Sequence, residues 1–280
     1  MRSVAIISKK SLWLVRDKRM DIKTAVQVLL KDGFILVFNE DRLDIVKTAG
    51  ALLEAGIGNM EVTCRIKKPL EKLKRLVREL PEFVAGAASL IDYPEMLNIA
   101  NRDHKDAPLP SVEDVVNAGA HYLVSAVNFR KETYEKYAGK LPIIPGCGSA
   151  TEIVTQFSLG ANLCKVFPAK ELGGPAFIKA VDPAIHKLIS LVPTGGTNAQ
   201  NIGDYIDAGV LVLGGSFSAI EKPVFAEIVS KQDDKLLAGE LKKTKELIDS
   251  KRSQKWPSID FANGSIEEIS RLTGRNFNIS

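Results

Sequence analysis

The stretch Asn59-Met60-Glu61-Val62-Thr63-Cys64-Arg65 predicts a β-strand in which polar and apolar side chains alternate. Successive residues of a strand point to opposite faces, so Glu61, Thr63 and Arg65 share one face and the other face is apolar. The apolar face is expected to pack on helices. The polar face then points into a closed barrel, where a charge is unfavourable unless it is paired or used. A satisfied internal ion pair and a functional site are the two readings of this face.

Apolar runs of strand length alternate with amphipathic stretches along most of the chain. The predicted strands are 34–38, 59–64, 83–90, 122–127, 143–145, 163–167, 188–193 and 210–213. The predicted helices are 41–56, 70–80, 93–102, 149–159, 176–181 and 198–208. Continuous apolar strands are typical of parallel strands buried on both faces. About eight strands, most of them followed by a helix, predict an α/β fold, a (β/α)8 TIM barrel. An open, doubly wound sheet fits less well, because no Gly-rich turn follows the first strand.

The chain divides into three predicted parts. Residues 1–20 are expected to form an N-terminal extension, 21–252 the barrel and 253–280 a C-terminal tail. The polar, Pro-containing segment 103–110 is expected to be a surface insertion. Two capping-box patterns, Ser149-x-x-Glu152 and Thr197-x-x-Gln200, are expected to begin helices.

Composition and charge exclude several classes of protein. The 280 residues are 45% hydrophobic and 26% charged, which is typical of a globular protein. A net charge of +4 is too small to indicate nucleic-acid binding. No apolar run is long enough to cross a membrane. Lys9 and Lys10 interrupt the apolar patches near the start, which argues against a secretory signal.

The cysteines and histidines indicate neither a disulfide framework nor a metal site. Three cysteines, Cys64, Cys147 and Cys164, lie in apolar segments and are read as reduced core residues, which predicts a cytoplasmic location. His104, His121 and His186 lack the spacing of a metal pair. We therefore expect neither a metal nor a cofactor.

A second interior charge is Lys165, which lies between apolar neighbours in the predicted strand 163–167. It faces the same way as Leu163 and Phe167. Lysine is rarely buried without a role, and desolvation favours the neutral amine that can attack a carbonyl. A lysine that reaches solvent from a strand end is the alternative. Combined with Glu61 and Arg65, a functional role is favoured.

Glycine pairs end the last two predicted strands, in Pro193-Thr194-Gly195-Gly196 and Gly214-Gly215-Ser216. Glycine lets backbone N–H groups approach an anion closely. In TIM barrels the loops after strands seven and eight frequently bind phosphate. Ordinary tight turns between strand and helix are the alternative.

These motifs resemble the class I 2-keto-3-deoxy-6-phosphogluconate / 4-hydroxy-2-oxoglutarate (KDPG/KHG) aldolase family. The matching segments are Glu61-Val62-Thr63-Cys64-Arg65, Ile144-Pro145-Gly146, Lys165-Val166-Phe167-Pro168-Ala169 and the two glycine motifs. The resemblance covers roughly 21–252. It implies a (β/α)8 barrel, a homotrimer and a small-molecule 2-keto acid as substrate, with pyruvate and an aldehyde as products.

The resemblance also implies roles for individual residues. Lys165 matches the lysine that forms the Schiff base, and Glu61 matches the general acid/base. Arg65 matches a ligand of the substrate carboxylate. The other matching substrate-binding positions are Ser89, Thr194, Gly195, Gly196, Gly215 and Ser216.

Three segments depart from the family pattern. Gly86-Ala87-Ala88-Ser89 stands where the family has Gly-Ala-Gly-Thr, Ser125-Ala126 where it has Ser-Pro, and Ser149-Ala150 where it has Thr-Pro. These departures bear on substrate identity more than on reaction type. Two other functions stay open: a sugar-phosphate isomerase or decarboxylase on the same barrel, and a non-catalytic binding module. Formation of a pyruvate adduct at Lys165 separates them from an aldolase.

Overall fold

The computed structural model describes residues 20–102, 105, 107–181 and 183–279. Residues 1–19 of the predicted extension and His104 lie outside this part, as does the side chain of His186. The strands are β1 (Phe34–Phe38), β2 (Asn59–Thr63), β3 (Val84–Leu90), β4 (Tyr122–Ser125), β5 (Ile143–Ile144), β6 (Gly146–Cys147), β7 (Cys164–Val166), β8 (Leu191–Pro193) and β9 (Leu213–Ser216).

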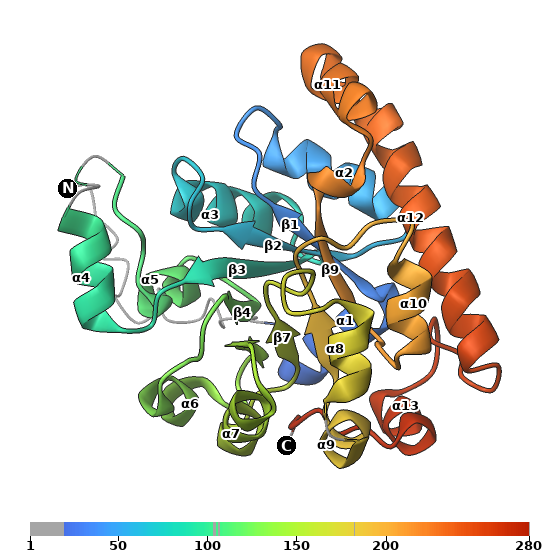
Figure 1. Cartoon of the computed structure of the whole chain (residues 1–280). Coiled ribbons are helices and arrows are strands. Elements are labelled where there is room, and N and C mark those ends of the chain that lie inside the picture. The colour runs from blue at the N-terminus through green and yellow to red at the C-terminus, as the bar shows by residue number, and fades with distance from the viewer. Residues whose placement is uncertain (1–19, 103–104, 106, 182, 280) are drawn as a thin grey trace, which may run out of the picture.

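Helices follow the strands and form the outer layer (Figure 1). They are α1 (Ile22–Asp32), α2 (Ile45–Glu54), α3 (Pro69–Glu79), α4 (Pro94–Arg102), α5 (Val112–Asn117), α6 (Lys131–Tyr137), α7 (Ala150–Leu159), α8 (Pro175–Ala180), α9 (Pro183–Leu188), α10 (Ile202–Asp207), the 3-10 turn η2 (Phe217–Ala219), α11 (Lys222–Lys231), α12 (Asp234–Lys255) and α13 (Ile266–Thr273). No helix in the described residues is both long and apolar enough to cross a membrane.

All the paired strands are parallel. Their hydrogen bonds join β5-β4-β3-β2-β1-β9 into one sheet and β6-β7-β8 into another. Only Pro145 separates β5 from β6, and it interrupts the strand because proline has no N–H to donate. The two short strands are therefore consecutive parts of one strand position in the barrel. At the other junction the Thr197 hydroxyl donates to the Gly214 carbonyl over 2.6 Å, which places the β8 loop against β9. The predicted TIM barrel is confirmed.

Several boundaries in the structure differ from the predicted ones, for local or long-range reasons. The helix predicted from residue 41 begins at Ile45, because the Asp44 side chain accepts hydrogen bonds from Val46 N and Lys47 N. The last strand was predicted at 210–213 and instead runs over Leu213–Ser216, in register with Phe34–Val37 of β1.

The Ser149 cap is confirmed, although the return hydrogen bond to Glu152 comes from Gly148 and not from the cap residue, and the predicted Thr197 capping box is wrong. Ser149 caps α7, with its hydroxyl accepting from Glu152 N and the Glu152 carboxylate accepting from Gly148 N. Thr197 caps nothing, because its hydroxyl is committed to Gly214 O, and α10 begins only at Ile202.

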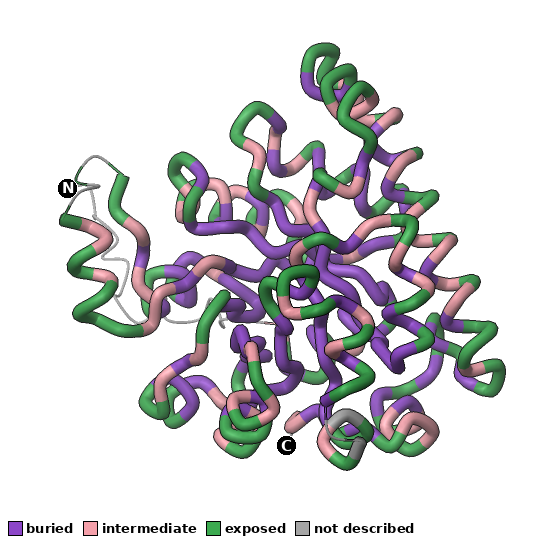
Figure 2. Tube along the Cα trace, in the orientation of Figure 1, coloured by how far each residue is buried: buried purple, intermediate pink, exposed green. Residues whose placement is uncertain are grey.

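The described part of the predicted insertion forms neither helix nor strand. Its end returns to α4, where the Asn101 side chain exchanges two hydrogen bonds with the backbone of Leu109. Helix α4 itself has no buried residue and lies apart from the barrel in Figure 1. Buried positions concentrate on the strands and on the inward sides of the other helices (Figure 2).

The base of the barrel, where the strands begin, is closed by α1 and by residues of the C-terminal tail. Leu29 and Leu30 of α1 pack in one apolar cluster with Val84 and Val124 inside the barrel. The same cluster takes in Ile259, Phe261, Ile266, Ile269 and Phe277.

Arg252 anchors this base. Its guanidinium donates to Leu30 O over 2.5 Å and lies 3.6 Å from the centre of the Phe261 ring. It thereby meets a free carbonyl at the C-terminus of α1, where a positive charge is favourable. Burial lowers the pKa of Arg252 to about 10.

Above the base lies a buried polar network. One oxygen of Asp32, Oδ2, accepts from Gly58 N and from Asn59 Nδ2, both at 2.7 Å. Asn59 Nδ2 also donates to Phe34 O, and Asn59 Oδ1 accepts from the Tyr122 hydroxyl over 3.3 Å. The network therefore ties α1, β1, β2 and β4 together. Burial raises the pKa of the Asp32 carboxyl from 3.8 to about 6.

The raised pKa predicts how Asp32→Asn changes stability with pH. Between pH 4 and 6 the folded protein holds a proton on Asp32 that the unfolded chain has released, so the wild type loses stability as the pH rises through this range. The variant lacks this loss, because an amide does not titrate in this range, and its oxygen can still accept both hydrogen bonds. Its stability relative to the wild type should rise by up to roughly 3 kcal/mol from pH 4 to pH 7.

Urea unfolding at both pH values measures this difference, and Glu54→Gln, an exposed position at the end of α2, is the control. An Asp32→Asn profile parallel to that of the wild type would refute the buried, protonated state.

Candidate functional site

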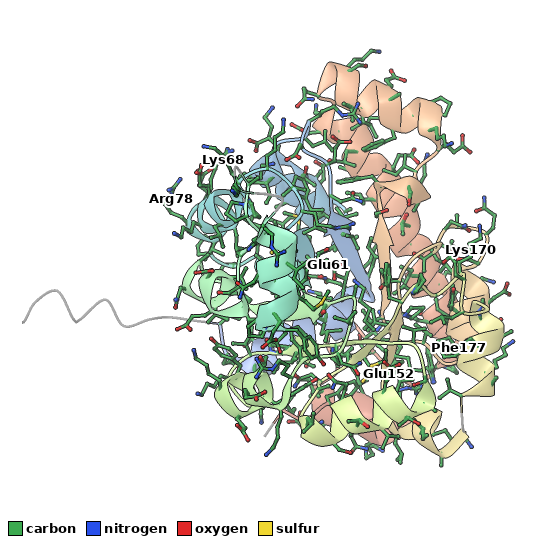
Figure 3. The ribbon with its side chains drawn as sticks, turned by 60° about the vertical axis from the view of Figure 1, so that its left-hand side comes forward. Glu61, Lys68, Arg78, Glu152, Lys170 and Phe177 are labelled. Atoms are coloured by element: carbon green, nitrogen blue, oxygen red, sulfur yellow. The ribbon has the colours of Figure 1, made fainter. Side chains whose placement is uncertain are left out.

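Lys165 of β7 and Glu61 of β2 meet inside the barrel. Lys165 Nζ lies 2.9 Å from Glu61 Oε1, and the two side chains are 7% and 4% exposed. The two side chains can meet across the interior, because the alternation of side chains along each strand turns both of them inward. Figure 3 shows Glu61 among the strands in the middle of the molecule.

This contact gives the pair a chemical capacity. A buried ammonium and a buried carboxylate stabilise each other, and each would be strongly unfavourable alone. Transfer of one proton from Lys165 to Glu61 leaves a neutral amine beside a carboxylic acid, which is a nucleophile beside a proton donor. Phe167 lies over the amine, with Lys165 Nζ 5.6 Å from the ring centre. Phe167 as a residue is 37% exposed, so it lies on the solvent side of the buried pair.

Arg65 and Ser89 form a second polar feature at the ends of β2 and β3. Arg65 is exposed, and its Nε donates to Ser89 Oγ over 3.1 Å. Ser89 has a φ of 59°, a left-handed conformation that is strained for a residue with a side chain. The pairing of β3 with β4 shifts register between Ala87 and Leu90, which brackets Ser89. Ser89 engages only the Nε of Arg65, and no ion pair among the described residues engages the rest of the guanidinium, which can bind a carboxylate.

The turn after β8 has the geometry of an anion site. Gly195 and Gly196 have φ values of 91° and 80°, which favour glycine. Their carbonyls face the protein: Gly195 O accepts from Lys170 N, and Gly196 O accepts from Asn201 Nδ2. Within the described part of the chain their N–H groups donate to no protein acceptor. Two such N–H groups form a concave site for an anion.

Packing accounts for the glycines of β9. A Cβ at Gly214 would lie 2.1 Å from Thr194 Oγ1, and a Cβ at Gly215 would lie 2.8 Å from the Phe34 ring. Thr194 is buried, and its hydroxyl contacts Val192 O at 3.4 Å. Ser216 begins the turn η2, with its Oγ accepting from Ser218 N and lying 2.8 Å from Ser218 Oγ. Its partly exposed hydroxyl is thus held at the end of β9, as the Gly195–Gly196 N–H groups are held at the end of β8.

The polar network of Asp32, Asn59 and Tyr122 was not predicted from the sequence. Asn59 precedes Glu61 by two residues and so shares its inward face, which was the available signal. Burial raises the pKa of the Tyr122 hydroxyl well above its usual value, and the charges of Glu61 and Asp32 add to this effect. The ring of Tyr122 packs on Gly86, where a Cβ would lie 2.2 Å from it. The carboxylate of Glu61 therefore stands above a fixed layer.

One segment that departs from the family pattern, Ser125-Ala126, contacts the neighbouring strands. Ser125 Oγ donates to Leu90 O over 2.9 Å, which joins the ends of β3 and β4. Gly146 lies against the carbonyl of Ala126, where a Cβ would come within 2.3 Å of the oxygen. Among the described residues, no group of three or more His, Cys, Asp or Glu side chains is placed to hold a metal ion.

Comparison with known proteins identifies a matching family. The family model described as KDPG and KHG aldolase matches residues 26–231. A 2-dehydro-3-deoxy-phosphogluconate aldolase of Pseudomonas aeruginosa is 30% identical over 202 residues, 71% of this chain and 84% of that protein. A KHG/KDPG aldolase of Escherichia coli is 27% identical over 198 residues, 70% of this chain and 85% of that protein.

A solved structure agrees with these matches. The KDPG aldolase of Legionella pneumophila, crystallised with pyruvate captured at low pH as a covalent carbinolamine intermediate, has a TM-score of 0.61 to this chain. The two are 26% identical, and the match covers 79% of this chain and 97% of that one.

The buried pair predicts that one substitution lowers the stability of the protein and that a second substitution restores it. Glu61→Gln leaves Lys165 buried without a compensating charge and should lower the free energy of unfolding by roughly 3 kcal/mol. Adding Lys165→Met removes the second charge and should return stability to within about 1 kcal/mol of the wild type, because replacing a whole buried pair is often neutral. Urea unfolding of the three proteins measures both steps. Equal losses in the single and double variants would show that the ion pair does not carry the effect.

Proposed function

The chain belongs to the KDPG and KHG aldolase family, and from this premise we propose that it is a class I, Schiff-base aldolase. It cleaves a 2-keto-3-deoxy-6-phospho-sugar acid, 4-hydroxy-2-oxoglutarate, or both. The products are pyruvate and an aldehyde, either glyceraldehyde 3-phosphate or glyoxylate. The observation that carries the proposal is the 2.9 Å contact between Lys165 Nζ and Glu61 Oε1 inside the barrel.

The first step forms the covalent intermediate. Glu61 accepts a proton from Lys165, and the neutral amine attacks the ketone carbon C2 of the substrate. The attacking nitrogen passes a proton to the ketone oxygen to give a carbinolamine. Glu61 then returns its proton to this hydroxyl, water leaves, and the iminium forms with Glu61 again a carboxylate. A carbinolamine of pyruvate is the species described for the Legionella relative, which supports this step.

The second step breaks the bond between C3 and C4. Glu61 as carboxylate takes the proton of the C4 hydroxyl, directly or through a water molecule, and the aldehyde leaves. The electrons of the broken bond pass to the iminium, which becomes an enamine of pyruvate. Protonation at C3 and hydrolysis then release pyruvate and restore the Lys165 amine.

Two groups of residues bind the two ends of the substrate, so that its reacting carbons lie beside Lys165 and Glu61. Arg65, oriented by Ser89, binds the C1 carboxylate, since a guanidinium forms paired hydrogen bonds with a carboxylate. The N–H groups of Gly195 and Gly196, with the Ser216 hydroxyl, bind the anionic group at the far end. Thr194 and Gly215 form the wall between these two groups of residues and the barrel core.

We further propose a cytoplasmic homotrimer. Three free cysteines, all buried, support a reducing compartment. The trimer rests on the resemblance to the family, and sedimentation of the purified protein tests it.

Reduction with borohydride in the presence of pyruvate tests the mechanism. The iminium should be trapped as a stable adduct on Lys165, located by peptide mass spectrometry. Lys165→Met should give no adduct and should lower kcat by roughly 10⁴-fold or more, because it removes the nucleophile. Lys222→Met, at the exposed start of α11, is the matched control and should be trapped like the wild type. A folded wild-type protein without an adduct would rule out the Schiff-base reaction.

The same chemistry predicts that no metal is needed, because the iminium serves as the electrophile. Dialysis against excess EDTA should leave kcat and KM within about twofold of their values in untreated enzyme, a change no larger than that of a minor interaction. The retro-aldol rate is followed by coupling pyruvate release to a metal-independent detection of pyruvate. A loss of activity that added divalent cations restore would contradict this prediction.

A further inference from the structure

A lysine outside the family motifs lies beside the Gly195–Gly196 turn. Lys170 follows β7, and its backbone N–H donates to Gly195 O over 3.1 Å. A Cβ built on Gly196 would lie 2.6 Å from Lys170 Cβ and 3.0 Å from Lys170 Cδ. The aliphatic part of the lysine therefore runs across the α-carbon of Gly196, over the turn that holds the free N–H groups. Figure 3 shows Lys170 toward the periphery, away from the central Glu61.

The charge of Lys170 is uncommitted. None of the ion pairs among the described residues includes Lys170, whereas other lysines, such as Lys165 and Lys72, are paired with carboxylates. The neighbouring carboxylate of Glu171 acts on the Tyr205 hydroxyl of α10, whose pKa it helps to raise. Lys170 is thus exposed, its side chain crosses the turn, and its ammonium group has no described protein partner.

The other groups of the proposed anion site are polar but uncharged. The N–H groups of Gly195 and Gly196 and the hydroxyl of Ser216 can each give a hydrogen bond, and none of them has a net charge. The other exposed cation of the site, Arg65, is held by Ser89 at the ends of β2 and β3. A full positive charge at the end of β8 can therefore come from Lys170.

We propose that Lys170 is a specificity-determining residue, whose ammonium pairs with the distal anion of the substrate and favours a phosphate dianion over a carboxylate. This inference rests on the proposed aldolase function. Coulomb attraction scales with the product of the charges, so a phosphate dianion gains about twice the attraction of a carboxylate at the same distance. The dipoles of the turn bind both groups, and the lysine discriminates between them.

Packing alone is the competing explanation for Lys170, because its methylenes cover Gly196 whatever its charge. Lys170→Met keeps an unbranched apolar side chain over Gly196 and removes the charge. Lys170→Arg keeps the charge. Lys179→Met, an exposed lysine in the last turn of α8, removes a charge of the same kind away from the turn and is the matched control.

The experiment measures kcat and KM of these variants with KDPG and with 4-hydroxy-2-oxoglutarate, and the inhibition constant of inorganic phosphate. In Lys170→Met the KM for KDPG should rise roughly three- to tenfold, in line with an exposed ion pair to a dianion, with kcat within about twofold. The KM for 4-hydroxy-2-oxoglutarate should rise less, and phosphate should inhibit more weakly. Lys170→Arg should restore most of the preference, and Lys179→Met should match the wild type.

Equal changes in KM for the two substrates, or none, would overturn the inference, as would a failure of Lys170→Arg to restore the preference. A failure of the proposed function is a separate result. It would appear as a wild-type protein that traps no pyruvate with borohydride, whereas trapping by the wild type with an unchanged preference in Lys170→Met would refute the role of Lys170 alone.

Discussion

The buried contact between Lys165 and Glu61 is the constraint on which the site depends. Two charges inside a barrel are tolerated only if each compensates the other, so β2 and β7 must present these side chains at one height. The same requirement makes the pair reactive, because a proton can pass between an amine and a carboxylate that are already in contact. In the proposed reaction, the contact that stabilises the two charges also supplies the nucleophile and its base.

The residues at the base of the barrel fix the position of Glu61 along β2. Asn59 is bound at once to Asp32, Phe34 and Tyr122, so the strand that carries Glu61 is tied to its neighbours two residues before the carboxylate. Arg252 joins α12 to the end of α1 and packs on Phe261. The tail predicted to begin at residue 253 therefore contributes contacts to the layer that supports the site.

The opposite end of the barrel carries the proposed binding groups, which differ in electrostatic character. Arg65 brings a full charge, oriented by a serine in a strained conformation. The turn after β8 brings two free N–H groups, and Lys170 lies across it. Because these groups stand on loops above a rigid pair, substrate choice can vary without altering the carbon–carbon chemistry. The departures at residues 86–89 and 125–126 lie in β3 and at the C-terminal end of β4.

The sequence by itself determined the features that depend on local periodicity. Alternation along residues 59–65 and 163–167 placed Glu61 and Lys165 on inward faces, and the apolar runs indicated a parallel barrel. Only the tertiary structure decided which distant groups share a hydrogen bond. Thr197 reads as a helix cap, yet its hydroxyl bonds to Gly214 O, and pairing with β1 rather than hydrophobicity sets the start of β9. Barrel closure chooses these partners, and it brings together residues whose separation along the chain leaves no local pattern.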